Sequence, residues 1–314
     1  MLGYVIRRVL ATIPVMVVVA AFVFLMLRLS PGDPASVIAG DYATAEDIAR
    51  IREQLGLNEP ILVQFTKWVA GLAQGDLGTS IFTNLPVTTL IAQRIEPTIM
   101  LTLTTIIFTV LVAVPLGTIA AWKAGSWIDR AVMVFSVAGF SVPVFVLGYI
   151  LIYIISIKLQ WLPVQGYRSM FEHGVGPFLR HIIMPTVTLS VIFIALIARM
   201  TRASVMEVLQ EDYVRTARAK GQSELKVLLS HALRNAAVPI VTVIGIGIAL
   251  LIGGVVVTES VYNIPGLGRL VLDAVLAPDY PIIQGLILFF SFIYILINLL
   301  IDLSYTLFDP RIRY

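Results

Sequence analysis

Long apolar runs separated by short polar stretches dominate the chain, and six of the runs contain no charged residue. About 20 helical residues are needed to cross the roughly 30 Å of hydrocarbon in a bilayer. Backbone groups in lipid must be paired within a helix or a closed barrel, and these runs lack the alternation of barrel strands. We therefore expect six transmembrane helices, near residues 9–27, 98–122, 131–157, 182–198, 236–258 and 280–301.

Prolines and glycines interrupt several of these runs. They indicate either kinks and irregular ends or the ordinary composition of membrane helices, which tolerate both residue types. The residues concerned are Pro14, Pro115, Pro143, Pro185 and Pro239, with Gly117, Gly139 and Gly148.

Composition supports a multi-span membrane protein. The 314 residues are 58% hydrophobic and 13% charged, and the mean hydropathy is +0.93, outside the range of soluble domains. A net charge of +3 is too small and scattered to indicate a nucleic-acid partner. The absence of cysteine excludes disulfides and thiolate chemistry. The first apolar run is longer than a signal-peptide core and lacks a cleavage site, so we expect a retained span.

The distribution of basic residues predicts the orientation of the spans. Cytoplasmic connections carry an excess of lysine and arginine. On that rule both termini and residues 199–235 are cytoplasmic, because the basic residues concentrate at Arg7, Arg8, Lys123, Arg130, Arg199, Arg202, Arg215, Arg218, Lys220, Lys226, Arg234, Arg311 and Arg313.

Two segments fall on the opposite, external side. Residues 31–97 are predicted to form a small helical subdomain, in which Thr44 and Asp47 resemble a capping box and Gly56 a helix stop. Residues 258–281 are too polar for lipid and too apolar for a free loop. We expect them to fold back against the bundle, where non-helical backbone can be shielded by protein.

The polar stretch EDYVRTARAKG at 211–221 predicts a short cytoplasmic helix. Acidic residues open it and basic residues follow, an order that suits the helix dipole, and Gly221 permits a left-handed turn. It is either a solvated basic loop or a helix that seats in a groove on another protein, with Ala217 and Ala219 allowing close approach. The candidate docking residues are Glu211, Asp212, Tyr213, Arg215, Thr216, Ala217, Arg218, Ala219, Lys220 and Gly221.

This segment resembles the coupling signature of ABC importer permeases, which reads Glu-Ala-Ala, three residues, Gly and later Leu-Pro. Ala217 and Gly221 match, whereas Arg215 and Thr216 replace the Glu and the first Ala, and Leu233-Arg234 replaces Leu-Pro. These departures are typical of the dipeptide/oligopeptide branch. Further similarities run along the whole chain: IRRVLATIP, PGDP, GDLG, RMTRAS, HALRNA, PGLG, DYP and DPRIR.

The resemblance implies an all-α membrane protein with six transmembrane helices, a small external subdomain between the first two and a cytoplasmic coupling helix between the fourth and fifth. Its parts would be residues 1–30 (first span), 31–97 (external subdomain) and 98–314 (permease core). Implied partners are a second homologous permease, two cytoplasmic ATPases that bind ATP and magnesium, an extracytoplasmic solute-binding protein and membrane lipid. The chain would be a non-enzymatic subunit without its own cofactor, in a prokaryotic plasma (inner) membrane.

The branch is dominated by di- and oligopeptide importers, but glutathione, nickel chelates, opines and some sugars use similar permeases. A stand-alone ion-coupled carrier is disfavoured because no span has a central acidic residue. A membrane-embedded hydrolase would need a catalytic constellation that the sequence lacks. No G-x-x-x-x-G-K-[ST] loop is present, so any ATP is bound by another chain.

Four ionisable residues lie near span ends and are candidate functional groups. Glu259 and Asp273 could meet a substrate ammonium in the translocation path, although interfacial solvation is the simpler interpretation. Arg28 and Asp302 suggest snorkelling rather than a proton relay. The three histidines fall on different connections, which disfavours a shared metal site.

Overall fold

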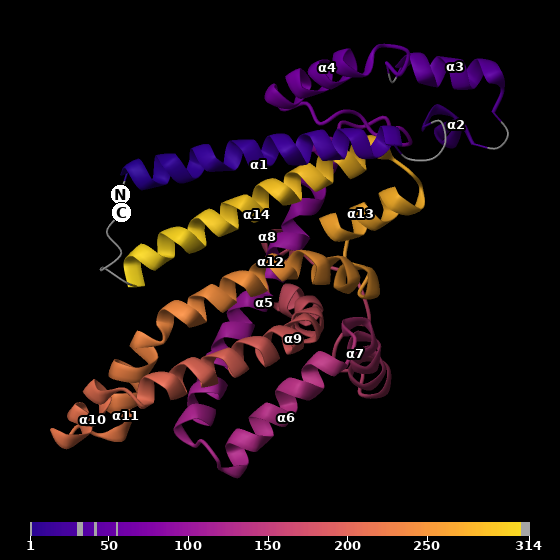
Figure 1. Ribbon diagram of the computed structural model, residues 1–314. Helices are drawn as coiled ribbons and strands as arrows, with labels where there is room; N and C mark the ends of the chain where they lie inside the picture. Colours follow the sequence, from indigo (N-terminus) through magenta and orange to yellow (C-terminus); the bar gives the residue numbers. More distant parts are fainter. Residues whose placement is uncertain (1, 30–33, 41–42, 55, 309–314) are drawn as a thin grey trace. The chain divides into compact units, whose positions relative to one another are not determined.

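The computed structural model describes residues 2–29, 34–40, 43–54 and 56–308. In these ranges the regular structure is helical, and one isolated bridge pairs Thr79 with Pro86. In chain order the helices (Figure 1) are α1 (Leu2–Leu29), α2 (Pro34–Ala39), α3 (Ala45–Gln54), α4 (Ile61–Ala73), α5 (Val87–Trp122), α6 (Trp127–Ser141), α7 (Val144–Leu151), η1 (Ile152–Lys158), α8 (Met170–His173), α9 (Val175–Leu209), α10 (Asp212–Ala219), α11 (Glu224–Lys226), η2 (Val227–Leu233), α12 (Ala237–Val261), α13 (Leu267–Leu276) and α14 (Tyr280–Phe308).

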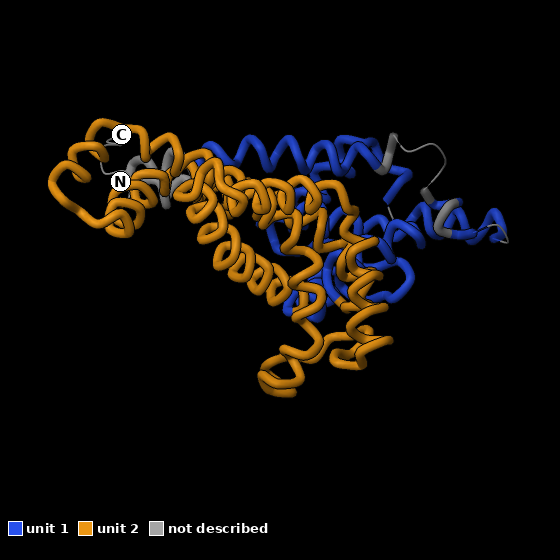
Figure 2. The backbone as a smooth tube through the Cα atoms, turned by 90° about the horizontal axis from the view of Figure 1, so that it is seen from below, with its two compact units in different colours: residues 1–96, 266–296 blue, residues 97–265, 297–314 orange. Residues whose placement is uncertain are grey.

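The chain divides into two compact units (Figure 2). Unit 1 contains residues 1–96 and 266–296, and unit 2 contains residues 97–265 and 297–314. The divisions fall inside α5 and α14, so each of these helices contributes to both units. Residues 266–296 therefore group with the N-terminal part of the chain. The division into a first span (1–30), an external subdomain (31–97) and a permease core (98–314) stays a prediction.

Four described helices are long and apolar enough to cross a membrane: α5, α9, α12 and residues 280–301 of α14. The expected span at 131–157 is instead a pair of helices, α6 and α7 with η1, which meet at 101°. The break lies at Pro143, where the preceding Val142 is extended because proline disfavours a helical residue before it. Counting this pair as one span makes five, and the predicted first span contributes a shorter apolar stretch, Leu10–Met26.

The other intramembrane prolines and glycines lie within continuous helices. Pro115 is inside α5 and Pro185 inside α9. Gly117 is a point of close helix packing, since an added Cβ would lie 2.5 Å from the carbonyl oxygen of Ala198 on α9. Gly139 on α6 similarly faces Ala195, at 3.2 Å. Small residues at such contacts let membrane helices approach each other closely.

Helix α9 is the centre of unit 2. It packs against α6, α7 and α12, and its buried side chains Leu189 and Phe193 join one cluster with Ile152, Leu251 and Tyr262. This arrangement surrounds α9 with protein along much of its length, and it carries the chain to the polar hairpin that follows Leu209.

The described residues between α1 and α5 include three helices, α2, α3 and α4, and their grouping as an external subdomain stays a prediction. Thr44 Oγ1 accepts the N–H of Asp47 at 3.2 Å, and a carboxylate oxygen of Asp47 accepts the N–H of Thr44 at 3.3 Å, which confirms the capping box. The side-chain hydrogen bond from Thr44 lowers the pKa of Asp47. Gly56 has φ +64° and donates to Glu53 O, as a helix stop requires.

Residues 258–281 are more regular than expected. Helix α12 continues to Val261, and α13 occupies Leu267–Leu276. Its buried Leu267 and Leu270 share a cluster with Val87 and Leu286 in unit 1. The segment is therefore largely helical; one side of α13 packs within unit 1, whereas Val275 and Leu276 are exposed.

Candidate functional site

The stretch 211–236 folds into a helical hairpin between α9 and α12. Helix α10 packs on η2, with Val214 and Ala217 buried against Val227. Val208 and Leu209 at the end of α9 border the same cluster. The short helix is thus held by the element that precedes it and by the element that follows it.

Gly221 ends α10 in a left-handed turn with φ +78°. Its N–H donates to Arg218 O at 2.9 Å, and the N–H of Gln222 donates to Ala217 O at 3.3 Å. This pair of bonds is a Schellman motif, and it confirms Gly221 as the helix stop. Most residues with a Cβ would be strained at this φ, and Asn is the best tolerated after Gly.

Polar bonds brace the hairpin from the side. The amide of Asn235 donates to Tyr213 Oη at 2.8 Å, joining α10 to the start of α12. His231 Nε2 lies 2.8 Å from Gln222 Oε1 and ties the turn to η2. His231 and Asn235 lie in the HALRNA motif, but the sequence alone does not indicate these bonds.

One side of α10 is left open. Asp212, Arg215, Thr216 and Ala219 are exposed and follow the i, i+3, i+4, i+7 spacing of a single helix face. Glu211, Tyr213, Arg218, Lys220 and Gly221 are exposed around that face and at the helix ends. Arg218 forms an ion pair with Glu224 at 3.0 Å. A slim polar face on a braced helix is suited to insertion into a groove.

The two alanines of α10 have different surroundings. Ala217 points into the hairpin and is buried, so its small size serves packing against η2. Ala219 is exposed on the open face. Only Ala219 is therefore available for close approach by another molecule in this conformation.

Glu259 is fully buried at the end of α12, with 0% of its surface exposed. Thr98 Oγ1 on α5 donates to Glu259 Oε1 at 2.6 Å. Interfacial solvation, the simpler interpretation of this residue, is wrong because none of its surface is exposed to solvent. In this conformation the carboxyl group joins two helices of unit 2.

Asp273 on α13 has a half-exposed side chain, 3.5 Å from Arg94. This solvated ion pair agrees with the simpler interpretation of Asp273. Asp273 belongs to unit 1 and Glu259 to unit 2, so a common path for the two carboxylates stays a prediction. The side chains of Arg28 and Asp302 lie outside the described residues.

The buried Asp129 forms an ion pair with the partly exposed Arg202, between α6 and α9. Arg202 donates two bonds to the carboxylate, one from Nε and one of 2.8 Å from Nη2, and the Gly125 N–H adds a third at 2.9 Å. The pair holds the 123–126 turn against α9, one to two turns before the hairpin. Arg202 lies in the RMTRAS motif, but its partner is 73 residues away and could not be identified from the sequence.

Asp279 joins two sequence motifs within unit 1. Its carboxylate accepts from Ser80 Oγ at 2.6 Å and from the Ile81 N–H at 3.1 Å, and it is buried. Ser80 ends the GDLG-T-S stretch and Asp279 begins DYP. The hydrogen bonds show that these two motifs form one structural joint.

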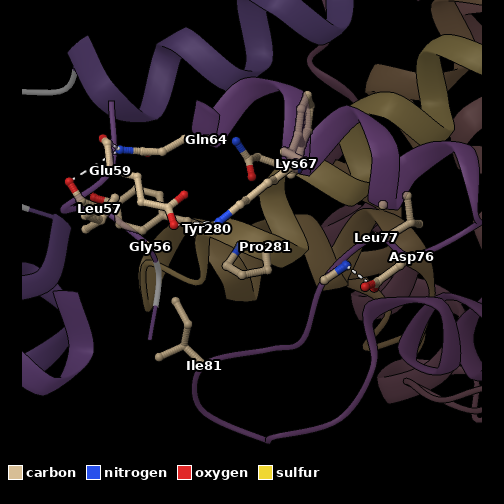
Figure 3. Close-up of a pocket in the computed structure, with 14 residues that line it drawn as sticks. Gly56, Leu57, Glu59, Gln64, Lys67, Asp76, Leu77, Ile81, Tyr280 and Pro281 are labelled. Atoms are coloured by element: carbon tan, nitrogen blue, oxygen red, sulfur yellow. Dashed lines mark hydrogen bonds and ion pairs between the residues drawn. The ribbon is translucent and has the colours of Figure 1, made fainter. Parts of the chain in front are cut away.

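A cavity of about 290 Å³ lies in unit 1 between α4, the loop after it and the start of α14 (Figure 3). Its charged groups pair with each other: Lys67 Nζ lies 2.5 Å from Glu59 Oε1, and the Gln64 amide donates to Glu59 O at 2.7 Å. Asp76 Oδ1 accepts the Gly78 N–H at 2.8 Å. Across the described residues, no group of three or more His, Cys, Asp or Glu could hold a metal ion.

Two family models together match almost the entire chain. Residues 113–314 match the inner membrane component of binding-protein-dependent transport systems. Residues 1–102 match the N-terminal part of the membrane component of the same systems. The chain belongs to this family. Family membership identifies it as an inner-membrane permease subunit of an ABC importer, with a transport rather than a catalytic role, which confirms the resemblance described above.

Relatives align over their full lengths. A probable peptide ABC transporter permease of Sinorhizobium fredii is 58% identical over 99% of both chains. A glutathione transport system permease of Salmonella paratyphi A is 46% identical over 100% of both chains. A putative peptide transport system permease of Brucella abortus is 44% identical, again over 100% of both.

The fold also matches a solved importer. An inward-facing structure of the MetNI methionine ABC transporter aligns with a TM-score of 0.58 and 16% identity, covering 71% of this chain and 97% of the other. At this identity the likeness concerns the fold alone.

Proposed function

We propose that this chain is the translocation subunit of an ATP-driven peptide importer. The proposal is supported by full-length relatives named for peptides at 58% and 44% identity. The glutathione alternative is represented by a relative at 46% identity. Purifying the importer with its binding protein and identifying the bound ligand tests this choice: a di- or oligopeptide supports the proposal, and glutathione, a nickel chelate, an opine or a sugar would contradict it.

In this proposal six spans, including α1, cross the plasma membrane, and both termini and the 199–235 segment face the cytosol. The chain pairs with a second, homologous permease, and substrate passes between them. Residues 31–97 and 258–281 form part of the external mouth that receives substrate from the solute-binding protein. Two cytoplasmic ATPases hydrolyse ATP.

In this proposal the hairpin at 211–236 transmits motion from the ATPase to the spans. The open face of α10, with Asp212, Thr216 and Ala219, docks in a groove of one ATPase. Because Val214 and Ala217 pack on η2 and Asn235 holds Tyr213, a movement of α10 is transmitted to α12. The ATPase can bias the spans only as far as its two conformations differ in their affinity for this face.

The exposed Ala219 offers a test that leaves the hairpin intact. We expect Ala219→Trp to release the ATPase on purification and to abolish substrate-stimulated ATP hydrolysis, because the larger ring blocks the groove. Ala219→Ser is the matched control and should keep both properties. Normal ATPase retention and coupling in Ala219→Trp would contradict docking through this face.

A further inference from the structure

Helix α4 exposes the apolar side that a soluble helix would bury. Leu62 is 74% exposed and Val69 is 38% exposed. With Thr66 and Ala73, which are also exposed, they form one face at i, i+4, i+7 and i+11. The only charged residue of α4 is Lys67, which is paired with Glu59 on the flank of the helix that lines the cavity.

The position of α4 within unit 1 indicates what covers this face. Phe65 and Trp68 pack on Phe24 of α1, with ring centroids 5.0 and 5.6 Å away. The carbonyl oxygen of the preceding residue, Val23, accepts a hydrogen bond from the Gln284 amide at 3.3 Å. Gln284 is one turn inside α14, a candidate span that begins at Tyr280, so α4 is attached level with the end of a span (Figure 1).

The exposed side of α1 near its contact with α4 is apolar. On α1, Phe22 is 67% exposed and Met26 is half-exposed. Two adjacent helices, α1 and α4, therefore expose large apolar side chains at the same level. Exposing this apolar surface to water would cost about 25 cal/mol per Å². Aromatic residues with a nearby lysine are typical of the membrane–water interface.

We propose that α4 is an interfacial helix whose Leu62–Val69 face is buried in the lipid leaflet at this end of the spans. Lys67 lies at headgroup level, and the Phe24–Phe65–Trp68 contact anchors the helix to α1. The molecules that cover the Leu62–Val69 face are lipids rather than a protein partner. This inference rests on α1 being a span, as in the proposed function.

The chain contains no cysteine, so single cysteines can be introduced without removing native residues of this chain, and nitroxide is attached in an importer whose partner subunits carry no reactive cysteine. Leu62→Cys and Val69→Cys are the test positions, in the assembled importer reconstituted in lipid nanodiscs. Phe22→Cys on α1 is the lipid control, and Glu46→Cys, exposed on α3, is the water control. The measurement is the relaxation of each label by oxygen, which partitions into lipid, and by a water-soluble nickel chelate.

We expect the labels at residues 62 and 69 to collide several-fold more with oxygen than with the chelate, as at residue 22, and the label at 46 to show the reverse. Preference for the chelate at 62 and 69 would overturn the inference, and so would protection from both reagents, which indicates a covering protein. If the label at residue 22 itself lies in water, the span assignment of α1 fails. If the labels at residues 62 and 69 lie in water while the label at residue 22 lies in lipid, the interfacial-helix proposal fails and the span assignment of α1 stands.

Discussion

Single polar residues hold together elements that are far apart in the chain. Asp279 accepts hydrogen bonds from Ser80 and Ile81, 199 and 198 residues away, and Asp129 binds Arg202 across 73 residues. Glu259 is bonded to Thr98 in the same manner. Buried carboxylates are costly unless their oxygens are paired, so each of these contacts fixes a helix position more strictly than apolar packing does.

Removing the Asp279 carboxylate should weaken unit 1. Asp279→Ala leaves the Ser80 hydroxyl and the Ile81 N–H without their acceptor, and a charged hydrogen-bond acceptor is worth about 1.5–3 kcal/mol. We expect a clear fall in the melting temperature of the purified protein. Asp273→Ala, which loses only a half-exposed ion pair with Arg94, is the control and should lower stability by less than about 1 kcal/mol. Equal melting temperatures for the two variants would contradict the assigned role of Asp279.

At the scale of elements, the helices of unit 2 are arranged by close contacts at small residues. Gly117 of α5 meets the backbone of α9 at Ala198, and Gly139 of α6 meets Ala195 on the same helix. Van der Waals packing replaces the hydrophobic effect between membrane helices, so such contacts determine which helices can pair.

Gly117→Ala should separate α5 from α9, because its Cβ would lie 2.5 Å from a backbone oxygen that cannot rotate away. Overpacking of this kind costs about 1–3 kcal/mol. Gly253→Ala is a matched control in α12, where an added Cβ meets nothing within 4 Å. We expect thermal denaturation in detergent to distinguish the two variants, and a stable Gly117→Ala protein would contradict the close approach.

The turn after α10 allows a sharper functional test. Proline holds φ near −65°, whereas Gly221 has φ +78° and donates to Arg218 O. Gly221→Pro should displace α10 and reduce substrate-stimulated ATP hydrolysis by about tenfold, a typical coupling factor. The spans should still insert. Gly221→Asn, which tolerates the left-handed conformation, should stay close to the parent, and unchanged stimulation in the proline variant would refute the assignment.

Local signals in the sequence predicted where these helices begin and end better than which side of each helix is buried. The α10 helix and its stop at Gly221 follow from charge order and one glycine, and the α3 cap follows from Thr44 and Asp47. The inward orientation of Ala217 depends on Val227 beyond the turn, which no local pattern specifies. Pro143 indicated an irregularity within 131–157, but not that the chain would turn through 101°.

At the scale of the whole molecule, the chain is a helical permease subunit. The ATPases that drive transport belong to the proposed function. Family membership and full-length relatives support an importer subunit. The burial of Glu259 could not be predicted from one sequence, since it requires α5 and α12 to meet. In the proposed function the translocation path lies between this chain and a second permease, so its lining residues come from both subunits.

Docking of α10 on an ATPase can be seen in a cryo-EM map of the assembled importer. We expect the open face of α10, with Asp212, Thr216 and Ala219, to lie in a groove of an ATPase subunit while Val214 and Ala217 stay packed on η2. A map in which this face is surrounded by solvent, with no subunit covering it, would refute the docking.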